Sequence, residues 1–195
     1  AYAVKTKSPH VMLSGAGAEE FAKEQGLEMV EDNMYFATPK TMEWIERLKQ
    51  ESKKNGTVGC VVLDKQGNLT AGTSTGGMFK KRWGRIGDSP VIGAGTYADN
   101  NSCAVSCTGH GEYFIRHAVA FDVCARYKYL KESVEKAADY IIHTELNTNA
   151  GNGGLIAVDK LGNIAMPYNS GGMFRGFLYK EKGSPEIKKG CGIGK

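Results

Sequence analysis

Two unlike regions of the chain meet in the segment NGTVGCVVLD, residues 55–64. Residues 47–55 before the junction are polar and rich in lysine, whereas residues 58–63 form an apolar run that indicates a buried strand. Thr57 therefore stands between a polar tether and the edge of a strand. If the chain cuts itself between Gly56 and Thr57, the threonine gains a free α-amino group, which can serve as the base for its own hydroxyl.

The same junction also has a purely structural interpretation. A loop that enters a strand often carries a β-branched residue, because β-branched side chains suit the half-buried surface of a sheet. Gly56 and Thr57 alone do not separate a nucleophile from a strand boundary. The other motifs of the chain must decide between the two interpretations.

The composition is that of an ordinary globular protein. With 195 residues, 41% hydrophobic and 24% charged, the sequence predicts a single domain spanning residues 1–195. The net charge of +4 is mild and its lysines are scattered, so we expect no nucleic-acid partner. No apolar run approaches the ~18 residues of a membrane span, and the first residues show no signal peptide. These features predict a cytoplasmic location and no membrane partner.

The cysteines favour neither disulfides nor a metal site. Their odd number and uneven spacing argue against a disulfide framework and favour a reducing compartment. Cys103, Cys107 and His110 resemble metal ligands, but residues 102–108 read as a buried strand. Cysteines four apart on a strand are about 13 Å apart, whereas two thiolates on one zinc ion are only ~4 Å apart. We therefore predict no metal and interpret both cysteines as small buried hydrophobic residues.

The spacing of apolar residues, together with residues that start or cap helices, predicts the remaining elements. A short strand is expected at residues 9–13. An amphipathic helix is expected to begin at Thr38-Pro39 and to run into a polar tail, mobile over about residues 49–56. Apolar spacing predicts one helix over residues 111–129, and Ser133 is expected to cap a second helix over residues 134–145. Strands and grouped helices together predict an α+β fold with antiparallel sheets.

One segment of the chain occurs twice. Residues 62–80 recur 95 positions later, as residues 157–175, and both copies contain Asp-Lys-x-Gly-Asn followed by a Gly-Gly-Met turn. Each copy is typical of a β-hairpin whose tight turn is formed by the Asp-Lys-x-Gly-Asn residues. The repeat therefore predicts two similar hairpins in packed sheets.

Two glycine-framed loops carry residues suited to catalysis. Arg85 and Asp88 lie on one loop, where they could hold the carboxylate and the ammonium group of an amino acid. Thr108 and Gly109 stand where a strand meets a helix, and a hydroxyl with a backbone N–H there could form an oxyanion hole. His110 is a conceivable base, but a threonine with its own amine does not need one, so we interpret it as a neighbour. A hairpin turn remains the plain alternative for each loop.

Five motifs in order closely resemble the plant-type L-asparaginase/isoaspartyl peptidase family of N-terminal-nucleophile hydrolases. The match runs from about Ser8 to Tyr179, and the related glycosylasparaginases share the central loops. The motifs are Gly56-Thr57-Val58-Gly59, Thr73-Ser74-Thr75-Gly76-Gly77-Met78, Gly84-Arg85-Ile86-Gly87-Asp88-Ser89-Pro90, Gly93-Ala94-Gly95-Thr96-Tyr97-Ala98 and Thr108-Gly109-His110-Gly111-Glu112.

The resemblance implies an autoproteolytic threonine hydrolase with a four-layer αββα sandwich. Residues 1–56 would form the end of an α-subunit, residues 57–195 a β-subunit, and two copies of each a heterotetramer. The roles that it implies are nucleophile for Thr57, neighbouring hydroxyl for Thr75, substrate clamps for Arg85 and Asp88, oxyanion stabilisers for Thr108 and Gly109, and a backbone contact to the substrate amine for Gly111.

The family also has more than a hundred residues before the part that matches Ser8. They include core strands, a sodium-binding loop and an asparagine near the nucleophile, so we expect this chain to lack the N-terminal part of the family domain and the sodium site. No cofactor is expected. The leading hypothesis is hydrolysis of β-aspartyl peptides and L-asparagine through an acyl-threonine intermediate. The alternatives are a glycosylasparaginase-like hydrolase and an inactive member that acts as a scaffold.

Overall fold

The computed structural model describes residues 1–39, 42–43, 46, 56–78, 81–181 and 183–194. These residues form two compact units, Ala1–Lys53 and Lys54–Lys195, and each is described by itself. The helix predicted from Thr38 and the mobile segment predicted at 49–56 fall mostly outside the described residues. The single domain expected for residues 1–195 stays a prediction.

The first unit is a chain of short helices, namely α1 (Tyr2–Lys7), α2 (Gly15–Glu24) and the 3-10 helix η1 (Asn33–Phe36). Neither α-helix buries a residue. The strand predicted at residues 9–13 is wrong, because this segment is irregular, with Val11 and Met12 exposed. A short apolar run becomes a strand only where a neighbour satisfies its backbone groups, and no described residue does so here.

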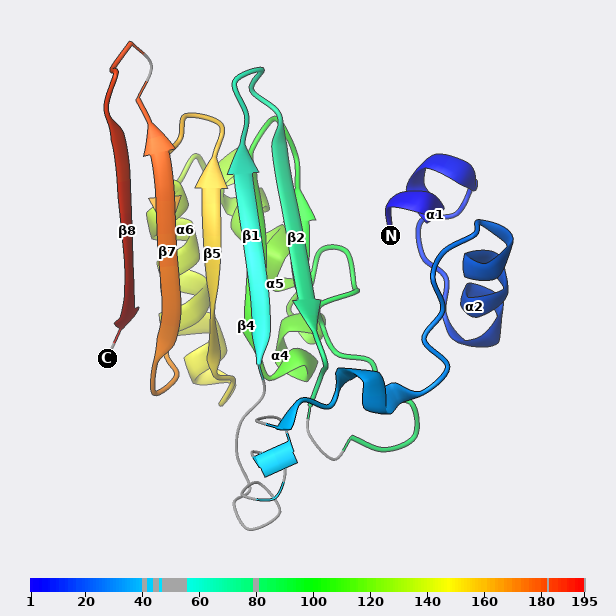
Figure 1. Ribbon diagram of the computed structural model, residues 1–195. Coiled ribbons are helices and arrows are strands. Elements are labelled where there is room, and N and C mark those ends of the chain that lie inside the picture. The colour runs from blue at the N-terminus through cyan, green and yellow to red at the C-terminus, as the bar shows by residue number, and fades with distance from the viewer. Residues whose placement is uncertain (40–41, 44–45, 47–55, 79–80, 182, 195) are drawn as a thin grey trace. The chain divides into compact units, whose positions relative to one another are not determined.

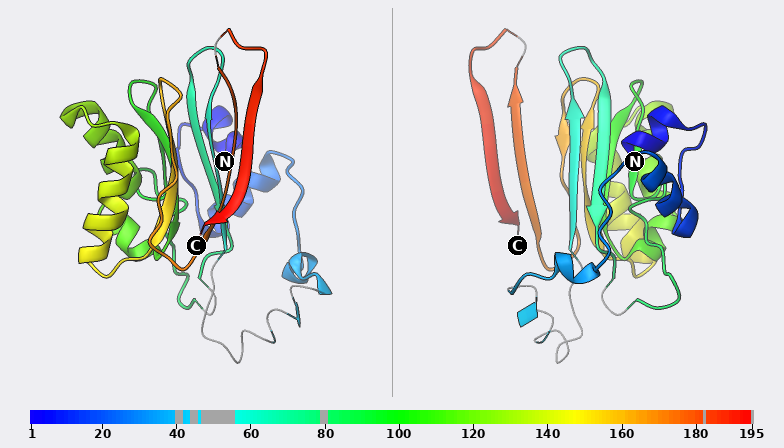
Figure 2. Two further views of the ribbon diagram at one scale, coloured as in Figure 1. Left: turned by 90° about the vertical axis from the view of Figure 1, so that its left-hand side faces the viewer. Right: turned by 45° about the vertical axis from the view of Figure 1, so that its right-hand side comes forward.

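The second unit has three layers, two of strands and one of helices (Figure 1; Figure 2, left view), and confirms the α+β class. The first sheet pairs β1 (Thr57–Leu63) with β2 (Leu69–Thr75), and the second has the order β3 (Thr96–Ala98), β4 (Cys103–Gly109), β5 (Gly153–Asp159) and β6 (Ile164–Ala165). A third, two-stranded sheet pairs β7 (Met173–Lys180) with β8 (Ile187–Gly194). All these pairs are antiparallel, as predicted.

The helices cover one face of the four-stranded sheet (Figure 2, left view). They are α4 (Gly111–Arg116), α5 (Val119–Ala125), the π-helix η2 (Arg126–Leu130), α6 (Val134–Tyr140) and the π-helix η3 (Ile141–Leu146). The core between sheet and helices contains Phe114, Ile141 and Leu155, and also Cys103 and Cys107, as predicted for small buried residues. The hydroxyl of Ser133 accepts the backbone N–H of Lys136 at 3.2 Å, which confirms the predicted cap.

A smaller apolar cluster joins the two sheets. Leu69 from β2, Ala104 from β4 and Val158 from β5 form its buried centre. Along β1, residues alternate between partly buried and exposed, so Thr57 and Gly59 lie on the same inward face as Val61 and Leu63. The hairpin is therefore anchored by apolar side chains near its turn, and Thr57 stands at its opposite end.

The two predicted hairpins are confirmed down to individual hydrogen bonds. In the first turn, Asp64 Oδ1 accepts the N–H groups of Gln66 and Asn68 at 2.8 and 2.7 Å, and Oδ2 accepts the Asn68 amide at 2.8 Å. Asp159 Oδ1 accepts Leu161 and Asn163 N–H at 2.8 and 2.9 Å, and Oδ2 accepts the Asn163 amide at 2.8 Å. The shared Asp-Lys-x-Gly-Asn sequence thus forms the same hydrogen-bonded turn twice, although Asp64 is exposed and Asp159 is buried.

The helix predicted over residues 111–129 is broken, and the break supports a loop. Ala118 adopts a left-handed conformation (φ 46°, ψ 46°) and separates α4 from α5. The N–H of Ala120 donates to the carbonyl of Ala94 at 3.1 Å, and that of Phe121 donates to Gly93 at 2.8 Å. The first N–H groups of a helix have no partner inside it, so the break makes them available to fix residues 93–94.

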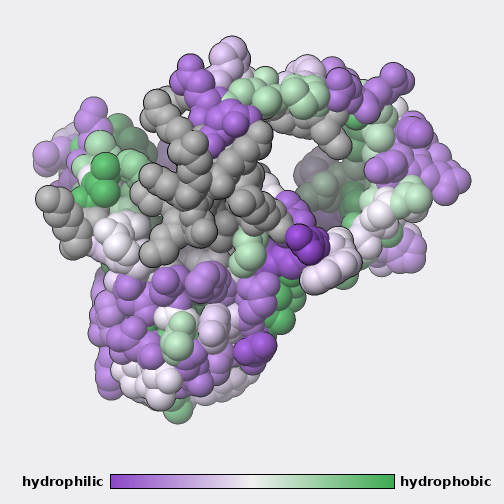
Figure 3. All heavy atoms as spheres, turned by 90° about the horizontal axis from the view of Figure 1, so that it is seen from below, coloured by the Kyte–Doolittle hydropathy of each residue, from purple (hydrophilic) through white to green (hydrophobic). Residues whose placement is uncertain are grey.

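Hydrophilic and hydrophobic side chains gather over different elements of the second unit. Seen from below (Figure 3), hydrophilic side chains predominate over the layer of helices, and hydrophobic ones gather beside the β7–β8 hairpin. That hairpin exposes Phe174, Leu178 and Ile193. Among the described residues, no helix has the length and apolar character needed to cross a membrane.

Candidate active site

The two threonines of the predicted site face each other across the first hairpin. Thr57 opens β1, Thr75 closes β2, and the strand register pairs them directly. The Thr57 hydroxyl donates to Thr75 Oγ1 at 3.3 Å, and the Thr75 hydroxyl donates to the carbonyl oxygen of Gly56 at 2.8 Å. Gly77 N–H donates to Thr75 Oγ1 at 3.0 Å. The hydroxyl of Thr75 therefore links the predicted nucleophile with the carbonyl of the predicted cleavage site.

Asp88 is a buried carboxylate at the centre of the glycine-framed loop. Its carbonyl accepts the N–H groups of Val91 and Gly95 at 2.9 and 3.1 Å, which folds the loop around it. The side chain is only 6% exposed, and among the described residues its Oδ2 has no hydrogen-bond partner. Burial raises the pKa of this carboxyl, and the positive charge of Arg85 opposes the rise only in part. A cationic ligand group would satisfy both the charge and the oxygen.

Arg85 is held by a carboxylate that the sequence analysis left without a role. Its Nε and Nη2 donate to Glu112 Oε1 and Oε2 at 2.8 and 2.9 Å, a bidentate ion pair. These hydrogen bonds lower the pKa of Glu112 to about 2. The guanidinium fork thus binds a carboxylate of the chain itself, and the clamp on a substrate carboxylate stays a prediction. A substrate carboxylate must displace or share Glu112.

The three glycines near the predicted oxyanion hole allow close backbone contacts. A Cβ on Gly111 would lie 2.8 Å from Asp88 Oδ1 and 2.9 Å from Arg85 Nη2. Gly109 has a φ of 155°, and a Cβ there would lie 2.4 Å from the carbonyl oxygen of Asn152. Gly153, which pairs with Gly109, would meet the Thr108 carbonyl at 2.2 Å. Side chains at Gly109 and Gly153 would push β4 and β5 apart. A side chain at Gly111 would clash with Arg85 and Asp88.

A small cavity brings most of the predicted site residues together. Its lining comprises Thr57, Thr75, Gly77, Met78, Arg85, Gly87, Asp88, Ser89 and Gly109. Thr108 and Gly111 are not part of this lining. Thr108 directly precedes Gly109 in β4, and Gly111 lies against Asp88 and Arg85. His110 is also outside it and is exposed, and its N–H donates to Asn152 at 3.1 Å. The catalytic roles assigned to these residues stay predictions.

Three further hydroxyl residues, to which the sequence analysis gave no role, form hydrogen bonds to one another and to the loop that carries Asp88. Thr73 Oγ1 is 2.7 Å from Ser106 Oγ and also accepts the hydroxyl of Thr96. Thr and Ser in strands are read from a sequence as strand formers, so no local signal singled them out. Glu112 was missed for a related reason, since its partner Arg85 is distant in the sequence.

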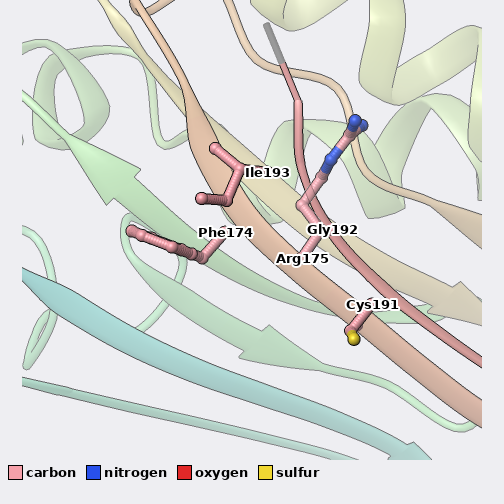
Figure 4. A pocket seen from close by; sticks show the side chains of 6 residues that line it. Phe174, Arg175, Cys191, Gly192 and Ile193 are labelled. Carbon is pink, nitrogen blue, oxygen red and sulfur yellow. The ribbon is translucent and has the colours of Figure 1, made fainter.

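A second, shallow hollow lies on the β7–β8 hairpin (Figure 4), lined by Phe174, Arg175, Gly176, Cys191, Gly192 and Ile193. Phe174 and Ile193 are cross-strand partners. The Arg175 guanidinium is engaged elsewhere, with Nη1 donating to the carbonyl of Met166 at 2.8 Å. The hollow gathers no set of catalytic groups. No group of three or more His, Cys, Asp or Glu among the described residues could hold a metal ion.

We expect the carboxyl of Asp88 to titrate above its ordinary value of 3.8, because burial disfavours the charged form. A folded-state pKa that is raised favours the folded state at low pH, and this contribution is lost as pH rises through that pKa. NMR of the Asp88 carboxyl carbon across pH 2–8 measures this pKa. Asp64 is the internal control, since hydrogen bonds from Asn68 lower its pKa. An Asp88 signal that titrates at or below that of Asp64 would contradict the burial argument.

Comparison with known proteins agrees with this arrangement. A family model described as asparaginase matches residues 1–187. The chain is 46% identical to an isoaspartyl peptidase of Salmonella typhimurium, over 90% of the chain and 60% of that protein. It is 42% identical to the isoaspartyl peptidase of Escherichia coli (92% and 63%) and 42% identical to a probable isoaspartyl peptidase/L-asparaginase of Arabidopsis thaliana (89% and 62%). The chain thus spans about three fifths of the length of these relatives.

Proposed function

This chain belongs to the asparaginase family, and from that we propose that the protein is an amidohydrolase that cuts itself between Gly56 and Thr57. It then hydrolyses β-aspartyl peptides and L-asparagine through an acyl-threonine intermediate. The observation that carries the proposal is the chain of hydrogen bonds from Thr57 through Thr75 to the carbonyl oxygen of Gly56. A strand boundary without chemistry has no need of a hydroxyl on that oxygen.

Self-cleavage follows from this geometry. The Thr57 hydroxyl attacks the Gly56 carbonyl carbon, and its proton leaves through the hydroxyl of Thr75. The Gly56–Thr57 C–N bond breaks, and the nitrogen takes up the proton lost by the hydroxyl to become the free amine of Thr57. Water then hydrolyses the ester that joins Gly56 to Thr57 Oγ1. Residues 1–56 then belong to the end of the α-chain and residues 57–195 to the β-chain.

Hydrolysis uses the same threonine with its new amine as base. Asp88 binds the α-ammonium group of an aspartyl substrate and Arg85 its α-carboxylate, with the Gly111 backbone beside the amine. The scissile carbonyl is then the side-chain one. Thr57 attacks it, Thr108 and the Gly109 N–H stabilise the oxyanion, and the leaving amine departs before water releases aspartate. Nucleophile and base belong to one residue, so the proposed reaction needs no cofactor.

The proposed assembly is a four-layer αββα sandwich in an (αβ)2 heterotetramer. Exposed apolar side chains on the outer face of β1, Val58 (68%) and Val62 (46%), support a further layer over this sheet. We also propose a cytoplasmic location, which the free, buried thiols of Cys103, Cys107 and Cys124 support.

A side-by-side assay tests the proposed function on the protein that contains this chain in full. β-Aspartyl-leucine should be the best substrate, since it offers extra surface to the cavity rim, and asparagine should follow. Glycosyl-asparagine should be poor. α-Aspartyl-leucine should not be cleaved, because its α-carboxylate is an amide and cannot pair with Arg85.

The other outcomes are equally informative. Turnover of the α-linked peptide would contradict the clamp roles of Arg85 and Asp88. A strong preference for glycosyl-asparagine would make the protein a glycosylasparaginase-like hydrolase. No turnover of any substrate by a correctly cut protein would leave the scaffold interpretation.

A further inference from the structure

Three hydroxyl side chains meet between the β1–β2 sheet and the four-stranded sheet of the second unit. They come from three strands: Thr73 from β2, Thr96 from β3 and Ser106 from β4. Thr73 Oγ1 lies 2.7 Å from Ser106 Oγ, accepts the Thr96 hydroxyl and donates to the carbonyl of Gly95 at 3.2 Å. We call these three residues the hydroxyl cluster.

Thr73 is at the centre of the hydrogen bonds of the cluster, and the direction of its single proton decides how they are shared. If Thr73 donates its proton to Gly95, Ser106 must donate to Thr73, and Thr96 donates either to Thr73 or to the carbonyl of Ser89 at 3.3 Å. Each hydroxyl proton then has an acceptor. Removing the Thr73 hydroxyl would take a donor from the Gly95 carbonyl and an acceptor from Ser106, which costs more in a partly buried site than in water.

The hairpin makes room for the cluster at one position. Gly59 is the cross-strand partner of Thr73, and a Cβ on Gly59 would lie 2.2 Å from Ser106 Oγ. The seryl side chain therefore occupies the space that any other residue at 59 would fill. Thr73 also lies two residues from Thr75, so both point to the same side of β2.

The cluster also contacts the loop that carries Asp88, which binds the substrate in the proposed function. Of the two carbonyl acceptors of the cluster, Ser89 directly follows Asp88, and Gly95 closes the turn that Asp88 begins. Gly95 is in direct contact with that turn, since its N–H donates to the Asp88 carbonyl and a Cβ there would lie 2.8 Å from Asp88 Oδ2. One hydrogen-bonded group thus touches the strand that carries Thr75 and the loop that carries Asp88.

We propose that Thr73 is a positioning residue, whose hydroxyl sets the place of the Thr57–Thr75 end of the hairpin relative to the Asp88 loop. This inference rests on the proposed function, because the loop binds the substrate and the hairpin attacks it. Reacting groups that are misplaced by about 1 Å can lose on the order of a hundredfold in rate. Thr73 does not touch the substrate and acts through Thr75 and Gly95.

Thr73→Val tests the proposal, since it removes the hydroxyl and keeps the branched shape. We expect kcat on β-aspartyl-leucine to fall by about tenfold to a hundredfold, with KM changed much less because Arg85 and Asp88 remain. Thr73→Ser should restore most of kcat. Ser106→Ala, which removes one donor to Thr73, is the milder second variant. Ser102→Ala is the matched control. Ser102 has a buried hydroxyl just before β4, the strand that carries Ser106, and is outside the cluster.

Amide hydrogen exchange provides a readout that does not depend on activity. Thr73→Val should speed exchange in two separate segments, around residues 75–77 and 89–95, and Ser102→Ala in neither. Faster exchange confined to β2, or an unchanged kcat in an active enzyme, would overturn the positioning role. If the wild-type protein hydrolyses no β-aspartyl substrate, the proposed function fails, and the exchange pattern still decides whether Thr73 joins the two segments.

Discussion

Thr57→Ala remains a single chain after long incubation, whereas the wild-type protein separates into residues 1–56 and 57–195: this is the expected result of a denaturing gel and an intact-mass measurement. Alanine has no hydroxyl to attack the Gly56 carbonyl, so the ester that precedes cleavage cannot form. The same change removes the nucleophile for substrates, so hydrolysis should fall to background even in protein that is cut by other means.

Thr57→Ser is the matched control, because serine keeps both a hydroxyl and, after cleavage, an α-amine. It should cut itself at the same bond, and the mass of the second fragment should match a start at residue 57. Cleavage of Thr57→Ala at Gly56 would mean that an outside protease makes the cut, and the self-cleavage proposal would then fail.

Arg85→Ala has the second-largest expected effect, and it should separate the two reactions of the site. Self-cleavage involves no substrate carboxylate and should proceed nearly as in the wild type. Hydrolysis of β-aspartyl-leucine should fall about tenfold to a hundredfold in kcat/KM, from the loss of one charge-assisted interaction of ~1.5–3 kcal/mol. Arg85→Lys should recover only part of this, because an ammonium group cannot form the two parallel bonds of a guanidinium fork.

Two controls refine this experiment. Arg82→Ala removes an exposed arginine from the same loop, where its guanidinium lies 6.0 Å from the ring of Trp83, and should leave kcat/KM unchanged. Glu112→Gln weakens the competing ion pair with Arg85 and should lower KM if substrate and Glu112 compete for the fork. Full activity of Arg85→Ala would remove this residue from the substrate site.

The features predicted correctly from the sequence are those decided by neighbouring residues. Each hairpin turn depends on an aspartate that accepts N–H groups two and four positions later, so the Asp-Lys-x-Gly-Asn sequence contains all the groups that it needs. The Ser133 cap is equally local. The apolar run at residues 58–63 predicted the strand β1 and so placed Thr57 at its end. The run also predicted a buried strand, and this part was wrong, because Val58 and Val62 are exposed.

The features that were missed depend on residues far apart in the chain. The break at Ala118 is stabilised by the carbonyls of Gly93 and Ala94, which no reading of residues 111–129 includes. The Arg85–Glu112 pair and the hydroxyl cluster form only after β2, β3, β4 and the loops have assembled. The strand expected at residues 9–13 did not form for the opposite reason, since no described residue pairs with its backbone as the pattern assumes.

The duplicated hairpin has a consequence for how such a site can arise. The offset of 95 that relates the two turns also relates Thr57 to Asn152 and Thr75 to Ser170, and the pairing of Gly59 with Thr73 recurs as that of Gly154 with Tyr168. The second copy contains β5, in the interior of a four-stranded sheet, where each substitution must satisfy neighbours on both sides. Among the described residues the first copy pairs as a two-stranded sheet with an exposed turn, so fewer strand neighbours constrain its sequence. The proposed nucleophile Thr57 thus belongs to the copy that has fewer strand neighbours among the described residues.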